Sequence, residues 1–189
     1  NLPESILVVG GGYIAVEFVG ILHGLGVHTT LSYRGNQLLR HFDTDLGKSL
    51  LVEMDKQGVE VMLESNVTSL LKSDTAIDVS FSDGTPKTFG AVLYATGRTP
   101  ATQGIGLENT CVELRSNGEV VVDAYFQSNE PSIFALGDII GTPELTPVAI
   151  AQGMAFVDSW FKGEKRVVDY DALPTAVFSH PNIATVGLS

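Results

Sequence analysis

Residues 5–25, SILVVGGGYIAVEFVGILHGL, decide the fold of this chain. The apolar run at 6–9 is typical of a strand buried on both faces, and three glycines follow it directly. The residues from 13 to 25 then carry apolar side chains at helical spacing, and Gly26 marks the end of the expected helix. The stretch therefore predicts a strand, a glycine turn and a helix in immediate succession. The apolar positions of that helix are Ile14, Phe18, Ile21, Leu22 and Leu25.

The glycine turn matches the dinucleotide-binding pattern G-x-G-x-x-G/A at Gly10, Gly12 and Ala15. In this pattern the first glycine permits the tight turn, the second lets a pyrophosphate approach the backbone, and the small third residue allows close helix packing. The helix N-terminus adds N–H groups and the positive end of a dipole. A plain tight turn is the alternative, but the strand–turn–helix context favours nucleotide binding.

Composition and charge narrow the function classes. A chain of 189 residues suits one or two domains, and its net charge of -11 argues against binding to nucleic-acid phosphates. No apolar run is long enough for a membrane helix, and no signal peptide is visible. Because the chain starts at Asn1 rather than Met, we expect it to be a piece of a longer protein. The single cysteine, Cys111, excludes a disulfide or a redox-active cysteine pair within the chain.

The loop after the second expected strand, residues 27–32, lacks an acidic residue. NAD-binding domains use an Asp or Glu there to bind the ribose 2′-hydroxyl. This chain instead carries Arg34 and Arg40, and a guanidinium pairs well with a 2′-phosphate. We therefore expect NADPH in preference to NADH, with two solvated loop arginines as the alternative. No metal site is expected, because His23, His28 and His41 have no ligand-like spacing.

The remainder of the first hundred residues predicts an α/β fold. A helix at 45–57 and a strand at 59–63 continue the alternation, and a further buried strand is expected at 91–94. Between them, residues 66–89 consist of short alternating runs around an Asp-Gly turn, as in an antiparallel meander. We expect a Rossmann-like doubly wound parallel sheet with an added antiparallel β-meander.

Five segments carry a resemblance to a known family: VVGGGYIAVEFVGIL, YRGNQLLRHFD, YATGRTP, IFALGDI and ELTPVAIAQG. The segments occur in the order that is found in the pyridine nucleotide–disulfide oxidoreductases, and FSHPNIATVG follows them near the end. The chain therefore resembles that family over nearly its whole length. LTPVA separates it from lipoamide dehydrogenases and mercuric reductases and is shared with trypanothione reductase and the large thioredoxin reductases. GYIAVE with the paired arginines favours the glutathione reductase type. One departure is Gly11, where alanine is usual.

The resemblance implies an NADPH-binding domain at 1–98, the C-terminal part of an FAD-binding domain at 99–167, and the start of an interface or dimerisation domain at 168–189. A hairpin at 112–122 and a strand at 132–136 are expected in the second part, before a helix at 148–162. The implied function is that of a cytoplasmic, homodimeric flavoprotein in redox homeostasis. NADPH would reduce FAD, and the reduced flavin would reduce a cysteine pair outside this chain. That pair would then reduce the substrate, glutathione disulfide.

Other functions stay open at this point. These residues could form a non-catalytic nucleotide-binding fragment, or part of a trypanothione or thioredoxin reductase. A flavin oxidase or peroxide reductase on the same scaffold is a third possibility. A C-x4-C pair in the preceding sequence would favour disulfide reduction.

The resemblance also implies roles for single residues. Asp138 would bind the ribityl chain of the flavin; the alternative is a turn or cap residue with no ligand. Glu144 would approach the nicotinamide; the alternative is an ordinary acidic loop residue. Tyr13 would cover the flavin; the alternative is an aromatic side chain that only packs in the core. Glu17 would pair with a lysine outside this chain and so lack a partner here; the alternative is a solvated surface acid. His180 is not expected to be catalytic, and neither catalytic residues nor metal ligands are expected. The expected NADPH-binding residues are Gly10, Gly11, Gly12, Tyr13, Ile14, Ala15, Glu17, Arg34, Arg40, Gly97 and Glu144, and those for FAD are Asp138, Leu145 and Thr146.

Overall fold

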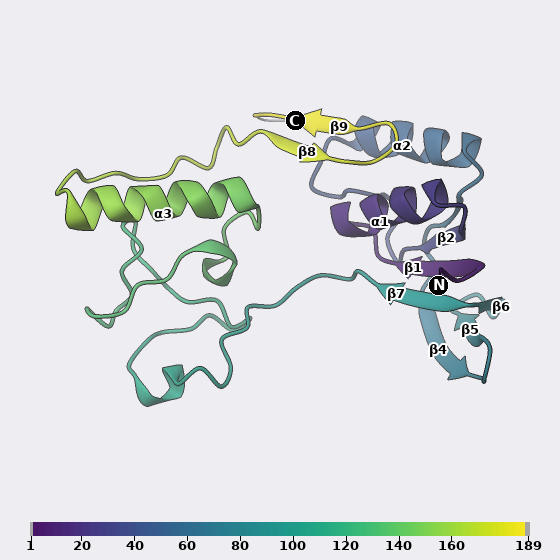
Figure 1. The fold of residues 1–189 in the computed structure, drawn as a ribbon, viewed down its shortest axis with the longest axis horizontal. Helices are drawn as coiled ribbons and strands as arrows, with labels where there is room; N and C mark the ends of the chain where they lie inside the picture. Colours follow the sequence, from purple (N-terminus) through teal and green to yellow (C-terminus); the bar gives the residue numbers. More distant parts are fainter. Residues whose placement is uncertain (1, 188–189) are drawn as a thin grey trace. The chain divides into compact units, whose positions relative to one another are not determined.

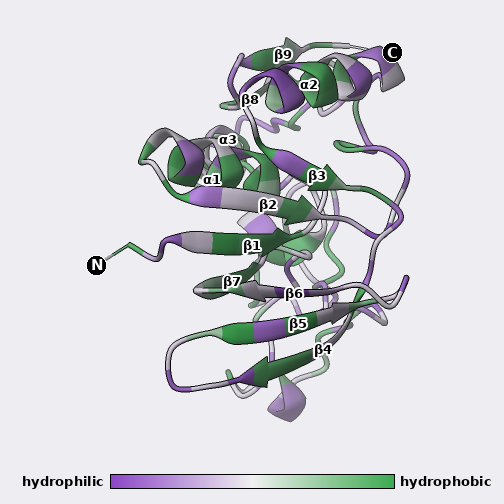
Figure 2. Ribbon diagram, turned by 90° about the vertical axis from the view of Figure 1, so that its right-hand side faces the viewer, coloured by the Kyte–Doolittle hydropathy of each residue, from purple (hydrophilic) through white to green (hydrophobic). Residues whose placement is uncertain are grey.

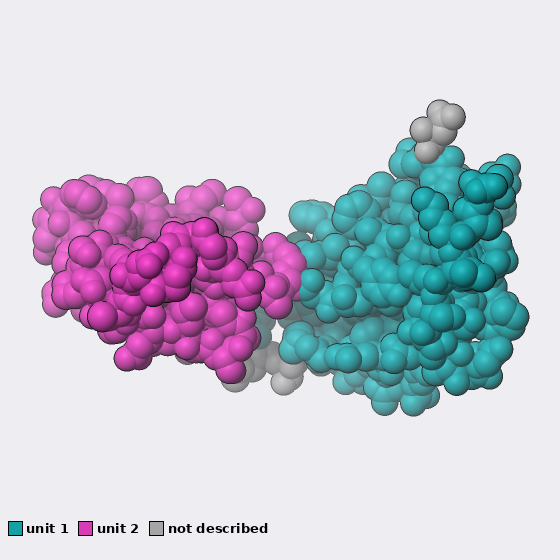
Figure 3. All heavy atoms as spheres, turned by 90° about the horizontal axis from the view of Figure 1, so that it is seen from below, with its two compact units in different colours: residues 1–97, 174–189 teal, residues 98–173 magenta. Residues whose placement is uncertain are grey.

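The computed structural model describes residues 2–187 (Figure 1). They form two compact units, coloured separately in Figure 3. Among the described residues, the first unit consists of 2–97 together with 174–187, and the second of 98–173. The last part of the chain therefore belongs to the same unit as the glycine turn.

A parallel sheet of four strands forms the centre of the first unit (Figure 2). The strand order is β3 (Glu60–Met62), β2 (His28–Ser32), β1 (Ser5–Val9) and β7 (Ala91–Tyr94), and each neighbouring pair is parallel. The apolar run of β1 is buried throughout because this strand lies between two others and is covered on both faces. The parallel sheet and its strand–turn–helix start were both predicted, and the α/β fold class is confirmed.

Two helices, α1 (Tyr13–Gly24) and α2 (Thr44–Lys56), cover one face of this sheet. Val8 of the central strand points to this face. The Asp43 carboxylate caps α2 by accepting a hydrogen bond of 2.8 Å from the Asp45 N–H. The buried residues of this core include Ala15, Val16, Val19, Leu31, Leu50, Met54 and Val59.

The other face of the sheet is covered by an antiparallel meander, which the sequence predicted, although not its place on this face. Its strands are β4 (Val67–Lys72), β5 (Ile77–Phe81) and β6 (Pro86–Phe89), in sequential order. Leu7 and Val9 pack here, because alternate side chains of a strand point to opposite faces. The other buried residues of this second core are Val79, Phe81 and Phe89.

The buried face of α1 differs from the predicted one. Phe18, Ile21 and Leu25 are 44%, 50% and 60% exposed, although all three continue the apolar helical pattern. Smaller residues at 15, 16 and 19 face the sheet instead, since a helix that follows a tight glycine turn must lie close to its strand. The large apolar side chains are consequently left on the outer surface of the first unit.

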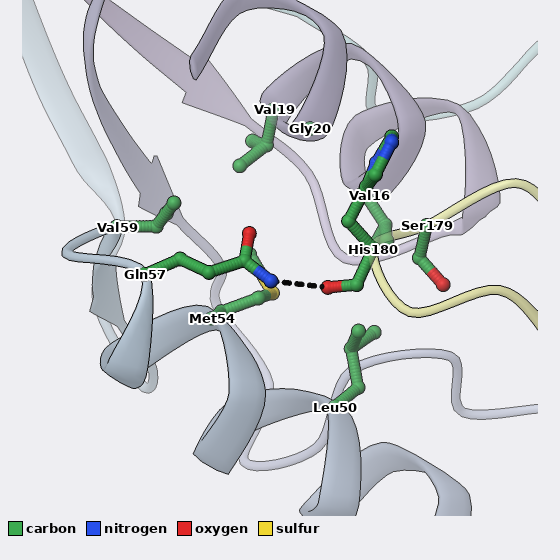
Figure 4. A pocket seen from close by; sticks show the side chains of 9 residues that line it. All are labelled: Val16, Val19, Gly20, Leu50, Met54, Gln57, Val59, Ser179 and His180. Carbon is green, nitrogen blue, oxygen red and sulfur yellow. Dashed lines mark hydrogen bonds between the residues drawn. The ribbon is translucent and has the colours of Figure 1, made fainter. Parts of the chain in front are cut away.

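A C-terminal hairpin completes the first unit. Its strands, β8 (Thr175–Val177) and β9 (Ile183–Thr185), are antiparallel, and Val177 and Ile183 are buried in the same core as the two helices. Between the strands, the His180 carbonyl oxygen accepts a hydrogen bond of 2.9 Å from the Gln57 side chain (Figure 4). The hairpin thus covers the gap between α1 and α2.

The second unit is built around one helix, α3 (Thr146–Phe161), and two 3-10 turns, η1 (Leu107–Asn109) and η2 (Gly137–Ile140). The hairpin predicted at 112–122 and the strand predicted at 132–136 are each reduced to a single isolated bridge, Leu114 with Val120 and Phe134 with Gln127. A ladder needs a neighbouring strand, and the part of this unit that the structure describes has no regular strand to supply it. Its buried core consists of Val120, Phe126, Ala135, Ile140 and Ala155.

The length and the hydropathy of a helix decide whether it can cross a membrane. Among residues 2–187, no helix combines the length and the apolar character needed to cross a membrane.

Candidate functional site

The glycine turn lies where the ends of three strands of the parallel sheet meet. The Gly10 N–H donates a hydrogen bond of 2.9 Å to the Ser32 carbonyl at the end of β2. A Cβ atom on Gly10 would lie 2.3 Å from the Ala95 carbonyl oxygen just after β7, and the residue has a positive φ of 148°. Only glycine fits this position, because both the backbone angle and the close approach exclude a side chain.

The next part of the turn opens onto free space. Gly12 is the N-cap of α1, and a Cβ atom placed on it would meet nothing within 4 Å. Ala15 is fully buried, and its Cβ would be 3.2 Å from a Cβ on Gly10, so the helix begins close to the strand. The first N–H groups of a helix have no acceptor within it. This turn therefore has both the room and the donors that a pyrophosphate requires.

Tyr33 explains the glycine that departs from the family pattern. A Cβ atom on Gly11 would lie 2.5 Å from the Tyr33 ring, and one on Gly35 would lie 2.6 Å from the same ring. The tyrosine therefore packs against the glycine turn in space that an alanine at position 11 would occupy. The sequence analysis missed this residue, although its place directly after β2 was a usable signal.

A backbone contact brings the arginine-bearing loop to the glycine turn. The Leu39 N–H donates a hydrogen bond of 2.8 Å to the Gly11 carbonyl, and both Leu38 and Leu39 are buried in the first core. Arg40 follows this anchored residue directly. Within residues 2–187, neither Arg34 nor Arg40 forms an ion pair with a carboxylate, and both are exposed. Two such guanidinium groups beside the turn can bind a phosphate.

Glu17 differs from the expectation that it lacks a partner in this chain. Its carboxylate Oε1 accepts a hydrogen bond of 2.9 Å from the Phe178 N–H, in the segment after β8. The expectation was wrong because it did not foresee that the C-terminal hairpin packs on α1. Tyr13 and Ile14, also expected near the cofactor, are half-buried in the first turn of the same helix, and Gly97 is exposed just after β7.

Two carboxylates expected to contact the cofactors lie around one arginine in the second unit. Arg98 Nη1 lies 3.2 Å from Asp138 Oδ2, and Arg98 Nη2 lies 2.7 Å from Glu144 Oε2. The same guanidinium donates a hydrogen bond of 3.3 Å to the Glu144 carbonyl. Arg98 was not among the predicted site residues, although it belongs to the quoted YATGRTP motif. It joins the two carboxylates that the sequence analysis had assigned to different cofactors.

The start of α3 lies directly after this pair of carboxylates. Leu145 is the N-cap, Thr146 is the first residue, and Pro147 occupies the first turn. The Leu145 carbonyl accepts hydrogen bonds from the N–H groups of Val148 and Ala149, at 3.0 and 3.1 Å. The helix thus begins with a regular first turn next to Asp138 and Glu144. Across the described part of the chain, no cluster of three or more His, Cys, Asp or Glu side chains could hold a metal ion.

Comparison with known proteins agrees with this arrangement. The chain is 43% identical over 187 residues to a glutathione reductase of Burkholderia cepacia, covering 99% of this chain and 42% of that protein. It is 40% identical over 194 residues to a trypanothione reductase of Leishmania donovani, covering all of this chain and 39% of that protein. The chain therefore spans about two fifths of the length of these relatives.

Solved structures give the same result. The flavoprotein disulfide reductase RclA of Escherichia coli, solved as a Cu(II) complex, matches all of this chain with 43% of its own length. The TM-score is 0.94 at 27% sequence identity. Residues 1–153, which include the glycine turn, the arginine loop and the start of α3, match the pyridine nucleotide-disulphide oxidoreductase family. The chain belongs to that family.

Proposed function

We propose that this chain forms the NADPH-binding part of a flavoprotein disulfide reductase that acts on glutathione disulfide. The observation that carries the proposal is the open turn at Gly12 with two exposed arginines on the loop anchored beside it, neither of them ion-paired to a carboxylate among the described residues. A turn that served only to connect β1 and α1 would need neither the free space nor the guanidinium groups.

The NADPH-side residues each have a defined task in this proposal. The backbone at Gly12 and the N-terminus of α1 receive the pyrophosphate, and Arg34 and Arg40 pair with the 2′-phosphate. When bound, NADPH supplies a hydride and FAD carries the electrons on to a cysteine pair. The anchoring bond from Leu39 to Gly11 keeps Arg40 next to the turn, so the loop does not have to be ordered when the nucleotide binds.

On the flavin side, Asp138 accepts hydrogen bonds from ribityl hydroxyl groups, and Leu145 and Thr146 present the N-terminus of α3 to the flavin ring. A positive helix end favours negative charge on that ring. Arg98 holds the Asp138 carboxylate in place and reduces the repulsion between it and Glu144. Glu144 is proposed to contact the nicotinamide.

The substrate, assembly and compartment are proposed from the relatives. A glutathione reductase and a trypanothione reductase are similarly distant, at 43% and 40% identity, and the paired arginines with GYIAVE favour the glutathione reductase type and hence glutathione disulfide. We propose a cytoplasmic homodimer in which residues 168–189 start the interface domain, 1–98 bind NADPH and 99–167 complete the FAD domain.

Steady-state kinetics of the longer protein test the proposal. NADPH oxidation should be supported by glutathione disulfide and far less by trypanothione disulfide or oxidised thioredoxin. Peroxide formation without any disulfide would identify a flavin oxidase instead. A longer protein that binds neither NADPH nor FAD would contradict the proposal altogether.

A further inference from the structure

One polar side chain in the core of the second unit has no role in the proposed function. Gln152 lies in the middle of α3 and is fully buried, with an exposed fraction of 0%. A buried carboxamide is costly unless its donors and acceptor are paired. The other buried residues of this helix are mostly apolar, so the burial of a carboxamide here needs a specific explanation.

The carboxamide of Gln152 is paired on both sides. Its Oε1 accepts a hydrogen bond of 2.6 Å from the Gly137 N–H. Its Nε2 donates to the Thr142 hydroxyl at 2.8 Å and to the Tyr170 hydroxyl at 3.0 Å. Both donors and one acceptor site of the amide are used. The backbone donor at Gly137 fixes which end of the amide faces it.

These bonds connect α3 to both ends of one loop. Gly137 is the residue immediately before Asp138, and Thr142 follows the loop's other end at Gly141. Gly137 also lies close to the helix, because a Cβ on it would be 3.8 Å from the Ala149 Cβ. The Asp138 carboxylate itself is half exposed, so its direction depends on the backbone that carries it and on its ion pair with Arg98 rather than on burial.

We propose that Gln152 is a positioning residue for the flavin site: it clamps the loop of residues 137–142 at both ends and so fixes the Asp138 carboxylate for the ribityl chain. This inference rests on the proposed function for its ligand, whereas the clamp itself stands on the three hydrogen bonds. Tyr170, beyond the end of α3, accepts the second hydrogen bond of the carboxamide nitrogen, so that Gln152 has one preferred orientation.

The first test measures the clamp without flavin. In the 189-residue chain, the Gly137 amide should exchange slowly with solvent, and Gln152→Leu should abolish that protection by removing the acceptor while keeping a similar volume. Ala155→Gly is the matched control, because Ala155 is equally buried in the same helix and packs in the apolar core that includes Ile140 of the loop, so the change perturbs helix packing without removing a hydrogen bond to the loop. Unchanged Gly137 protection in Gln152→Leu would overturn the clamp.

The second test measures FAD affinity in the longer protein. At conditions where Gln152→Leu and Ala155→Gly are equally stable, Gln152→Leu should raise the FAD dissociation constant by about tenfold, and Ala155→Gly by less than about twofold. Tyr170→Phe should give a smaller increase than Gln152→Leu, because it removes only one of the three hydrogen bonds and leaves both bonds to the loop. Equal FAD affinity of Gln152→Leu and Ala155→Gly would overturn the positioning role. A wild-type protein that binds no FAD would instead contradict the proposed function, and the exchange measurement would still decide the clamp.

Discussion

The two units reach a stable arrangement by different means. The first has a hydrogen-bonded parallel sheet covered by helices on one face and a meander on the other. The second has one long helix, and in its described residues the backbone pairing outside that helix consists of 3-10 turns and isolated bridges. Side-chain networks around Arg98, Gln152 and Asp158 hold it together instead. The first unit is therefore the more self-sufficient of the two.

The distribution of exposed apolar surface also differs between the units. On α3 of the second unit, Ile150, Met154 and Phe161 are 61%, 52% and 76% exposed. Large apolar side chains on one helix favour association with another surface. In the first unit, comparably exposed apolar side chains are spread over α1, α2, β4, β7 and the C-terminal segment.

The largest effect is expected when the 189-residue chain is purified by itself. It should bind NADPH through the first unit and carry no flavin, because half a site loses favourable contacts while the ligand still loses its translational freedom. It should also lack glutathione disulfide reduction and tend to self-associate. A visible spectrum and a turnover assay measure this. A yellow, active chain would remove the contrast between the units.

Gly12→Val should abolish nucleotide binding in the first unit. The side chain would enter the space proposed for the pyrophosphate, and we expect NADPH affinity to fall by at least about 100-fold, or about 2.8 kcal/mol. Stability should change little, because a Cβ at this position meets nothing within 4 Å. Calorimetric titration measures binding. Gly24→Ala, at the other end of α1 and equally free of contacts, is the control and should bind normally.

Gly11→Ala tests the contact with Tyr33. The new methyl group would lie 2.5 Å from the ring, and overpacking of this kind costs about 1–3 kcal/mol. Replacing Tyr33 by valine in the same chain should restore most of the lost stability. Urea unfolding of both single variants and the double variant measures the coupling. Additive effects would show that the ring moves away at no cost.

Arg34→Glu should reverse the coenzyme preference. The wild-type chain is expected to bind NADPH at least about 10-fold more tightly than NADH, or about 1.4 kcal/mol. A carboxylate at this position would repel the 2′-phosphate of NADPH and accept a hydrogen bond from the 2′-hydroxyl of NADH. Lys72→Glu on the meander makes the same change in net charge and should leave the preference unchanged. Equal affinities in the wild-type chain would disprove the assignment of the two arginines.

The smallest effect concerns acid stability. Hydrogen bonds from Lys162 and Arg166 hold the pKa of Asp158 below its ordinary value of 3.8, so its stabilising contribution to the second unit is present above that value. The contribution is lost as the pH falls through the lower folded-state pKa, because protonation breaks both ion pairs. Asp158→Asn should therefore flatten the acid limb of the second unit's unfolding, measured by urea titration below about pH 5.

Asp83 provides the matched measurement in the first unit. Its pKa is also lowered, chiefly by a hydrogen bond from the Thr85 N–H in the turn between β5 and β6. Asp83→Asn should flatten the acid dependence of the first unit and leave that of the second unchanged. If either substitution altered both units equally, the two would not unfold as separate bodies.

Much of the first unit could be predicted from sequence, because its signals are local. The alternation of apolar strands with a glycine turn and helices fixes a parallel sheet, and Gly10 and Gly12 identify themselves by spacing alone. The second unit was predicted less well: the strand expected at 132–136 has the right residues but no neighbouring strand in the described chain. Strand formation depends on a partner, which a local pattern does not contain.

The sequence by itself determined the class of fold, the glycine turn and the basic loop, since each depends on residues close together in the chain. Only the tertiary structure decided which distant residues meet. Tyr33 lies on Gly11, Glu17 binds the Phe178 N–H, and Arg98 joins Asp138 to Glu144. The clamp by Gln152 belongs to the same group, because its carboxamide reaches back 15 residues to Gly137. Such contacts follow from how the elements pack, and packing is set by the shape of the whole core rather than by any one segment.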